Sequence, residues 1–262
     1  RLLDGKGYSS ADGVPTAFRP PGYPAVLAAA GFFSRSVLLA KLLNVVFLVL
    51  GIFFLSRISR RISSGSEAYL PALFVGYPLM IYASSTLYPQ ILGLMLLSLI
   101  LEMILDDSGL SIKRVVWAGL ILGILVLSIP SFLLTVPLFC FVFVFIFRKS
   151  WRDWIRCCAG LVGPCLVVVS CWTVRNYDHW GRFIPVSTNS GLNLLLGNSE
   201  YSGPNTGVNV DISNYRAATA GMGEAERDAY LGSRAWRWIR DHPTQAIELY
   251  FKKVLKIGRA HV

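Results

Sequence analysis

Long apolar runs separated by short polar loops constrain the fold of this chain more than any other feature of its sequence. Hydrophobic residues make up 54% of the chain and charged residues only 15%, which is more apolar than is usual for a soluble domain. The apolar residues are concentrated in runs at 37–55, 68–84, 88–105, 115–129, 131–147 and 154–174. Because a helix needs roughly 20 such residues to cross a bilayer, the runs predict an all-α polytopic membrane protein.

The positions of the basic residues indicate which ends of these runs face the cytoplasm. The formal net charge is +10, but the lysines and arginines lie in short loops between apolar runs rather than in one nucleic-acid-binding patch. The three clusters are Arg57, Arg60 and Arg61; Lys113 and Arg114; and Arg148, Lys149, Arg152 and Arg156. By the positive-inside rule these loops are cytoplasmic, so the turns at 85–90 and 128–131 and both large polar segments lie outside. We expect membrane lipid, and no nucleic acid, as a partner.

This topology divides most of the chain into three parts. Residues 1–20 are polar and rich in turns, and form the end of a first extracytoplasmic loop. Residues 21–174 form a bundle of about six or seven transmembrane helices, of which 21–33 is short for a crossing. Residues 175–256 form an extracytoplasmic segment that is loop-like at first and helical over 224–256, with a break before Pro243. The last of these helices combines aromatic residues with lysines, which suits the membrane interface.

The two ends of the sequence predict a piece of a longer protein. The first residue is Arg1 rather than Met, and residues 257–262 read IGRAHV. That hexapeptide matches the translation of a common sequencing-adapter read. We therefore expect residues 257–262 to be an assembly artefact and assign no role to Arg259 or His261.

The chain changes character between residues 172 and 198. Arg175, Asn176 and Tyr177 follow the last apolar run, and the next residues are rich in Gly, Ser and Asn. Such small residues permit tight turns and close approach of the backbone to a ligand. The same pattern fits a helix end held by an interfacial Arg, Tyr and Trp belt and followed by an ordinary surface loop. The residues alone leave both interpretations open.

Motifs of soluble enzymes are missing from the sequence. It contains no phosphate loop, no GxSxG, no HExxH and no Cys/His pair at metal-ligand spacing, so we expect no protein metal site. All five cysteines fall in apolar runs, where we expect buried, inert thiols. Glu102 is the one acid well inside an apolar run; it lies about one turn from Asp106, so we expect it to extend toward water.

Three polar patches on the predicted outer face are candidates for a site. The first is Arg19, held by Pro20 and Pro21 beside the start of a helix that carries Tyr23. A guanidinium beside a helix N-terminus is a good anion site and suits a lipid phosphate, so we expect Arg19 and Tyr23 to bind that phosphate. The second is the hairpin tip at 82–90, with Tyr88 and Gln90.

The third patch combines Arg175, Asn176 and Tyr177 with three asparagines that follow them. The asparagines are Asn189, Asn193 and Asn198. Amides at this density suit the hydroxyl groups of a sugar, and they equally suit a turn-rich loop.

Several short motifs, taken in order, resemble the lipid-dependent glycosyltransferases of the GT-C superfamily. They are GKGY (5–8), PTAFRPPGYP (15–24), KLLN (41–44), RNY (175–177), GRF (181–183), STN (187–189) and GN (197–198). The resemblance covers nearly all of residues 1–256 and is closest to the branch that holds protein O-mannosyltransferases and lipid A aminoarabinose transferases. It implies a GT-C-type transmembrane helix bundle with extracytoplasmic loops, in the inner (cytoplasmic) membrane of a bacterium.

The resemblance also implies an activity and the roles of some residues. A sugar would move with inversion from a polyprenyl-phosphate donor to an acceptor lipid, glycan or protein on the extracytoplasmic face. Arg19 matches the basic residue that meets the donor phosphate. The family's catalytic Asp lies in the first external loop. Asp4 and Asp12 are too close to Arg19 to match it, so we expect it upstream of Arg1 and expect this piece alone to be inactive.

The resemblance does not firmly imply a cofactor. The family often has an acid at the hairpin tip, where this chain has Tyr88, Pro89 and Gln90, so a divalent metal stays open. Two other classes of function also stay open, a transporter or flippase and a non-catalytic membrane assembly protein. Transporters favour ionisable residues in the membrane core, whereas the polar residues here gather at one predicted face.

Overall fold

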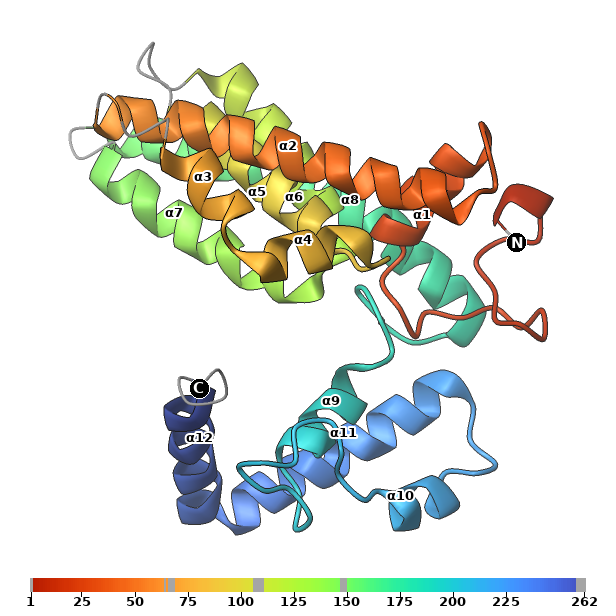
Figure 1. Ribbon diagram of the computed structural model, residues 1–262. Helices are drawn as coiled ribbons and strands as arrows, with labels where there is room; N and C mark the ends of the chain where they lie inside the picture. The colour runs from red at the N-terminus through yellow and green to blue at the C-terminus, as the bar shows by residue number, and fades with distance from the viewer. Residues whose placement is uncertain (1, 64, 66–68, 106–110, 147–149, 258–262) are drawn as a thin grey trace. The chain divides into compact units, whose positions relative to one another are not determined.

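The computed structural model describes residues 2–63, 65, 69–105, 111–146 and 150–257. The chain divides into two compact units, unit 1 over residues 1–186 and unit 2 over residues 187–262 (Figure 1). Within the described residues the regular structure is helical, apart from one isolated β-bridge between Ser9 and Pro15. The predicted all-α fold is confirmed for this part of the chain.

Unit 1 consists of a polar N-terminal segment followed by apolar helices. A short 3₁₀ helix, η1, covers Leu2–Asp4. The apolar helices are α1 (Gly22–Gly31), α2 (Val37–Ile62), α3 (Tyr69–Val75), α4 (Pro78–Ser85), α5 (Gln90–Ile104), α6 (Ile112–Ser128), the 3₁₀ helix η3 (Pro130–Leu134), α7 (Thr135–Ile146) and α8 (Trp151–Trp180). The predicted run 68–84 is thus two helices rather than one.

Prolines and serines explain several of the helix boundaries in unit 1. The residue before a proline disfavours helical backbone, and both Tyr77 (φ −101°, ψ 99°) and Ile129 (φ −140°, ψ 97°) are extended for this reason. The break at Tyr77 is what divides the 68–84 run. At their first turns, α2, α6 and α8 have a serine whose Oγ accepts a hydrogen bond from a backbone N–H; these serines are Ser36, Ser111 and Ser150.

Helix α8 is longer than the sequence predicts. The apolar run ends near residue 174, but the helix continues to Trp180 and ends at Gly181, which has a left-handed backbone (φ 60°). The N–H of Gly181 donates to the carbonyl of Tyr177 at 2.7 Å and satisfies one of the last carbonyls. The predicted boundary at 174/175 therefore falls inside a continuous helix, and Arg175–Tyr177 are helical residues.

The core of unit 1 is built around α6. Its buried residues Val115, Leu122 and Leu125 pack against α5, α7 and α8 in one cluster. A Cβ added at Gly119 would lie 2.3 Å from the carbonyl oxygen of Leu161, so glycine is what lets α6 and α8 approach this closely. Gly123 faces Cys165 and Val168 further along α8, so the two helices run parallel.

The exposed surface of unit 1 is strongly apolar. Only 17% and 22% of the most apolar windows of α2 and α8 are buried by the rest of the protein, and large side chains such as Val49 and Phe53 are exposed along α2. A soluble protein rarely exposes contiguous apolar surface of this extent, whereas lipid solvates it well.

By length and composition, two to three helical segments of the described chain could span a membrane. Helices α2 and α8 each qualify alone, and α4 with α5, bent by 110° at the break between them, qualify as a pair. The other apolar helices are shorter; α6 has 17 residues, and η3 with α7 covers 130–146. The chain is thus a helical protein with two or three candidate spans.

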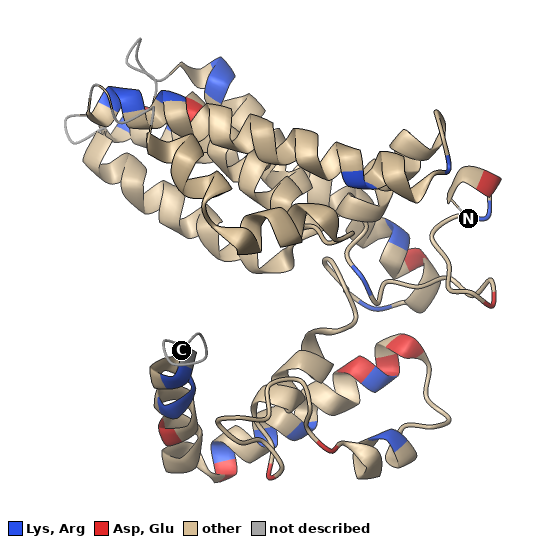
Figure 2. Cartoon of the chain, viewed as in Figure 1, with Lys and Arg blue, Asp and Glu red and all other residues tan. Residues whose placement is uncertain are grey.

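Basic residues gather at one end of unit 1, where α2 and α5 end and α6 and α8 begin (Figure 2). At this end Glu102 of α5 binds Arg57 (2.9 Å) and Arg61 (3.1 Å) of α2. Glu102 was expected to extend toward water; instead it is 15% exposed and held in an ion pair. Arg148, Lys149 and residues 106–110, which precede the basic pair Lys113 and Arg114, lie outside the described residues.

Unit 2 is a smaller helical unit. Its helices are α9 (Ser190–Gly197), α10 (Ser213–Ala218), α11 (Glu224–Asp241) and α12 (Pro243–Ile257). Leu195 of α9 and Leu231 and Ala235 of α11 form its core. The predicted helices over 224–256 and the break before Pro243 are confirmed. Residues 258–262 of the expected artefact lie outside the described residues.

Candidate functional site

A buried hydrogen-bond relay joins three elements at the end of unit 1 opposite the basic residues. The hydroxyl of Tyr23, in the first turn of α1, donates to Oδ1 of Asn44 on α2 at 3.1 Å. The Nδ2 of Asn44 in turn donates to the carbonyl of Thr86, between α4 and α5, at 2.6 Å. Asn44 is fully buried and Tyr23 is 5% exposed, so this relay fixes the start of α1 against the α4–α5 turn.

The relay places the first two predicted patches at the same end of unit 1. Arg19 lies four residues before Tyr23, and Tyr88 and Gln90 lie two and four residues after Thr86. The side chains of Arg19, Tyr88 and Gln90 are all exposed. These three side chains are therefore accessible to a ligand. The hydroxyl of Tyr23, which was predicted to bind the phosphate, instead donates its hydrogen bond to the buried Asn44.

The start of α1 favours an anion beside Arg19. Pro21 precedes the helix without a side-chain hydrogen bond to its first turn, so that turn has no side-chain acceptor. Helix N-termini attract negative charge, and a guanidinium adds two parallel N–H donors. Close packing fixes the position of this turn, since a Cβ at Gly22 would lie 2.4 Å from Oγ of Ser128 at the end of α6.

Arg175, by contrast, is a structural residue of unit 1. Its guanidinium donates to the carbonyls of Thr16 (3.0 Å) and Tyr8 (2.8 Å) and lies over the rings of Trp172 (4.7 Å) and Trp180 (5.2 Å). These contacts fasten the N-terminal segment to the last turns of α8. The predicted substrate-binding role of Arg175 is therefore not favoured by its surroundings, since the guanidinium already contacts two backbone carbonyls and two tryptophan rings.

The two residues after Arg175, Asn176 and Tyr177, differ in how far their side chains are exposed. Asn176 is fully buried and donates from Nδ2 to the carbonyl of Ile184 at 2.9 Å, so it holds the chain that follows α8. Tyr177 is 58% exposed and stays available to a ligand. Trp172, Arg175 and Asn176 therefore hold neighbouring segments of the chain against the end of α8. Of the two interpretations left open by the sequence, this favours a helix end held by interfacial residues over a ligand-binding loop.

The last part of the Gly-, Ser- and Asn-rich stretch, Ser190–Gly197, is the helix α9 rather than a ligand-binding loop. Asp228 of α11 accepts hydrogen bonds from the backbone N–H groups of Gly191 (2.7 Å) and Leu192 (3.3 Å) and from the hydroxyl of Ser190 (3.0 Å). This carboxylate stabilises the start of α9 in the way an N-terminal cap does. A Cβ at Gly191 would meet the carbonyl of Asp228 at 1.9 Å, so this glycine allows α9 and α11 to cross closely.

The three predicted asparagines therefore lie around α9 in unit 2. Asn189 precedes the helix and accepts a hydrogen bond from Ser187 (2.9 Å), and Asn198 follows it and donates to Leu194 (3.1 Å). Asn193 is exposed on the helix. Two of the three amides thus serve the local backbone or its neighbours, and only Asn193 is presented to solvent without a described partner.

Two residues at this end of unit 1 were missed by the sequence analysis. Asn44 was quoted only as part of the KLLN motif, although an amide inside an apolar run signals a buried partner. Tyr8 packs edge-on against Trp172 (ring centroids 5.2 Å) and its hydroxyl donates to the carbonyl of Arg19 (3.0 Å), which positions the backbone beside the exposed guanidinium.

One ion pair in the N-terminal segment shifts the pKa of a carboxyl group. The hydrogen bond from Arg35 (2.7 Å) lowers the pKa of the exposed Asp4 carboxyl, and the charge of Arg35 adds to that effect. Within the described residues, His, Cys, Asp and Glu side chains form no group of three that would hold a metal ion.

Comparisons with protein-family models, with curated proteins and with solved structures gave no match to this chain.

Proposed function

We propose that this chain is the membrane portion of an inverting glycosyltransferase that uses a polyprenyl-phosphate sugar as donor and acts at the extracytoplasmic face. The acceptor is a lipid, a glycan or a protein. In this proposal α2, α8 and the shorter apolar helices together form a GT-C-type bundle with about six or seven crossings. The end of unit 1 that carries Arg19 faces outward, because the basic loops lie at the other end.

The observation that carries the proposal is the exposed guanidinium of Arg19 at the start of α1. It lies on a rigid backbone, between the hydrogen bond that Tyr8 makes to its carbonyl and the tightly packed first turn of α1. When the bond between sugar and phosphate breaks, negative charge develops on the phosphate, and a preorganised guanidinium stabilises it. Tyr88 and Gln90, on the neighbouring turn, are assigned to contacts with the sugar.

The interior of unit 1 favours this proposal over a transporter. Its buried polar side chains within the described residues are Asn44, Ser84, Ser98, Ser128 and Asn176, and none of these carries a charge. Transporters commonly place ionisable groups near the middle of the membrane to bind ions or substrates. Glu102, the acid within the apolar run 88–105, is paired with arginines at the basic end.

The donor site can be tested by measuring binding of a polyprenyl phosphate to the chain in lipid nanodiscs. We expect Arg19→Ala to weaken binding about tenfold or more, because a charge-assisted bidentate contact is lost. Arg35→Ala is the matched control, since its side chain is 69% exposed and pairs with Asp4. Arg35→Ala should change binding less than about twofold.

Transfer is tested separately, with membranes that contain the product of the intact gene and a radiolabelled polyprenyl-phosphate sugar. Label should move to a membrane acceptor, and Arg19→Ala should reduce the rate. Equal effects of Arg19→Ala and Arg35→Ala on binding would remove the phosphate site. Binding without any transfer of label would instead favour a lipid transporter.

A further inference from the structure

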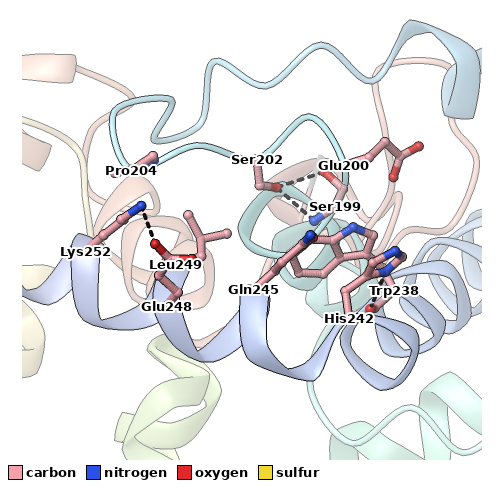
Figure 3. A pocket seen from close by; sticks show the side chains of 10 residues that line it. All are labelled: Ser199, Glu200, Ser202, Pro204, Trp238, His242, Gln245, Glu248, Leu249 and Lys252. Carbon is pink, nitrogen blue, oxygen red and sulfur yellow. Dashed lines mark hydrogen bonds and ion pairs between the residues drawn. The ribbon is translucent and has the colours of Figure 1, made fainter.

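Unit 2 contains a pocket of about 520 Å³ at the corner between α11 and α12 (Figure 3). Helix α11 ends at Asp241 and α12 begins at Pro243, so the chain turns sharply at His242. The loop after α9 forms the opposite wall with Ser199, Ser202 and Pro204. The volume falls within the range of about 300–1,000 Å³ that is usual for small-molecule sites.

The walls of the pocket are fixed by hydrogen bonds that do not involve a ligand. The hydroxyl of Ser202 donates to the carbonyl of Leu196 (3.1 Å) and accepts from the N–H of Ser199 (2.9 Å), which closes the loop. Lys253 of α12 donates to the carbonyl of Gly197 at 2.7 Å and ties the helix to the end of α9. A pocket whose walls are already ordered loses little conformational entropy when it binds a ligand.

One side of the pocket is aromatic. The ring of Trp238, in the last turns of α11, is stacked with that of His242 at a centroid distance of 5.6 Å and an interplanar angle of 27°. Figure 3 shows this stacked pair beside the amide of Gln245. An aromatic surface of this kind packs against the C–H groups of a flat, partly apolar ligand, and a pyranose ring presents such a face.

The polar groups around the aromatic pair include both donors and acceptors. Gln245 lies at the centre of the pocket, and its amide has no hydrogen-bond partner within the described chain. On its other side, Oε1 of Glu248 and Nζ of Lys252 are 2.6 Å apart. An amide, and a carboxylate next to an ammonium, each offer a donor and an acceptor side by side, which matches two neighbouring hydroxyl groups.

The charges in the pocket argue against an anionic ligand. Lys252 is neutralised by Glu248, and the carboxylate of Glu200 accepts a hydrogen bond from Tyr215 (2.8 Å). The lining therefore has no excess positive charge with which to hold a phosphate or a carboxylate. An apolar ligand is equally disfavoured, because it would desolvate Gln245, Glu248 and Lys252 without replacing their hydrogen bonds with water.

We propose that this pocket binds a neutral saccharide, with the sugar ring on the Trp238–His242 pair and its hydroxyl groups on Gln245 and the Glu248–Lys252 pair. The site is built wholly from residues of unit 2 and shares none with the phosphate site at Arg19. The proposal goes beyond the proposed transfer reaction and does not depend on it.

Binding can be measured on the full chain in nanodiscs, where no glycoside detergent competes. The probes are methyl mannoside and methyl glucoside, with mannose 6-phosphate as the charged counterpart, and the readout is saturation-transfer NMR. We expect the neutral sugars to bind and Trp238→Ala to weaken binding about tenfold. Trp236→Ala, on the same helix with a side chain that is 64% exposed and does not line the pocket, should change binding less than about twofold.

A second variant keeps the test decisive if Trp238→Ala destabilises unit 2. Gln245 is exposed on α12, so Gln245→Ala should leave the melting temperature unchanged and weaken binding about fivefold. Lack of binding by the unmodified chain, equal losses in Trp236→Ala and Trp238→Ala, no loss in Gln245→Ala, or a preference for mannose 6-phosphate would each overturn the proposal.

The two proposals can fail separately. Arg19→Ala should leave saccharide binding unchanged, and Trp238→Ala should leave polyprenyl-phosphate binding unchanged. Loss of saccharide binding in Arg19→Ala would assign the sugar to the donor site instead of this pocket.

Discussion

Units 1 and 2 bury the same kinds of side chain but expose different ones. Unit 1 exposes valine, leucine and phenylalanine along α2, α7 and α8, whereas the exposed surface of α11 in unit 2 is mostly charged. Only α12 in unit 2 shows an apolar stripe, with Ile247, Tyr250, Phe251 and Val254 exposed in helical spacing. The exposed surface of each unit therefore suits a different environment. That of unit 1 suits lipid, and that of unit 2 suits water or the membrane interface.

The two units also join their helices in different ways. In unit 1, α6 meets α8 through glycines that bring backbones together, which is a common device in lipid because apolar burial gives little gain there. In unit 2, glycine contact at Gly191 is combined with the Asp228 carboxylate on the backbone N–H groups of α9. The stability of unit 1 should therefore depend mainly on the close packing of its helices. The stability of unit 2 should depend both on close packing and on the charge of the Asp228 carboxylate.

The largest expected effect is that of Gly119→Val in unit 1. The new side chain would overlap the backbone of α8, where even a Cβ comes within 2.3 Å of the Leu161 carbonyl, and we expect a loss of about 3 kcal/mol or more. Thermal unfolding in nanodiscs measures it. Gly163→Ala is the control, since its Cβ would meet nothing within 4 Å; similar melting curves for the two variants would contradict the packing argument.

A smaller loss, of about 2 kcal/mol, is expected from Arg175→Ala, because the hydrogen bonds to Tyr8 and Thr16 and the contacts with two tryptophans disappear. The effect should be local and should appear as faster proteolysis of residues 5–20. The exposed Arg182, just beyond α8, provides the control substitution Arg182→Ala. Equal protease resistance in both variants would show that the N-terminal segment is held by other contacts.

In unit 2 the corresponding test is Asp228→Ala. It removes the acceptor for Gly191, Leu192 and Ser190 and should destabilise α9 by about 1–2 kcal/mol. Hydrogen exchange of the Gly191 and Leu192 amides should become faster. Asp241→Ala, which removes only a 3.6 Å surface ion pair with Arg240, should leave these amides unchanged.

The smallest expected effect concerns Tyr215 of unit 2. This residue should make the stability of unit 2 depend on pH in alkaline solution. Burial raises the pKa of the Tyr215 hydroxyl from 10.0 to about 12, and its hydrogen bond to Glu200 adds to the shift. Because the folded pKa exceeds the unfolded one, the folded state retains the proton that the unfolded state releases. Stability of unit 2 should therefore fall as the pH rises from 10 toward 12.

Tyr215→Phe tests this pH dependence. The variant should be less stable by about 1 kcal/mol below pH 10, since the hydrogen bond to Glu200 is lost. It should also lose less stability than the unmodified chain between pH 10 and 12. Parallel stability curves for the two proteins over that range would show that another group is responsible.

The sequence predicted helices well where the signal was local. The runs at 37–55, 88–105 and 115–129 and the helices over 224–256 all correspond to helices, because apolar runs, prolines and the break before Pro243 act within a few residues. The extension of α8 to Trp180 could have been read from Gly181, a typical helix stop. The division of 68–84 at Tyr77 could have been read from Pro78.

The rest depends on partners far away in the chain. Residues 190–197 become a helix because Asp228, 37 residues after Gly191, caps them. Arg175, a candidate ligand-binding residue in the sequence, instead holds the N-terminal segment, because its partner Tyr8 lies 167 residues earlier in the chain. Of the predicted site residues, Arg19, Tyr88, Gln90, Tyr177 and Asn193 are exposed, while Tyr23 and Asn176 are buried. Local composition cannot distinguish these two groups, because each residue type suits either role.

The relay from Tyr23 through Asn44 to Thr86 has a consequence for the order of events during synthesis. Helices α1 and α2 leave the ribosome before Thr86 does, because 42 residues separate Asn44 from its acceptor. Until the α4–α5 turn arrives, the Nδ2 group of Asn44 lacks its acceptor, and an unsatisfied polar group in hydrocarbon costs several kcal/mol. Insertion of α2 into the membrane therefore becomes fully favourable only when the next hairpin joins it, so these helices should enter the bilayer as a group and not one at a time.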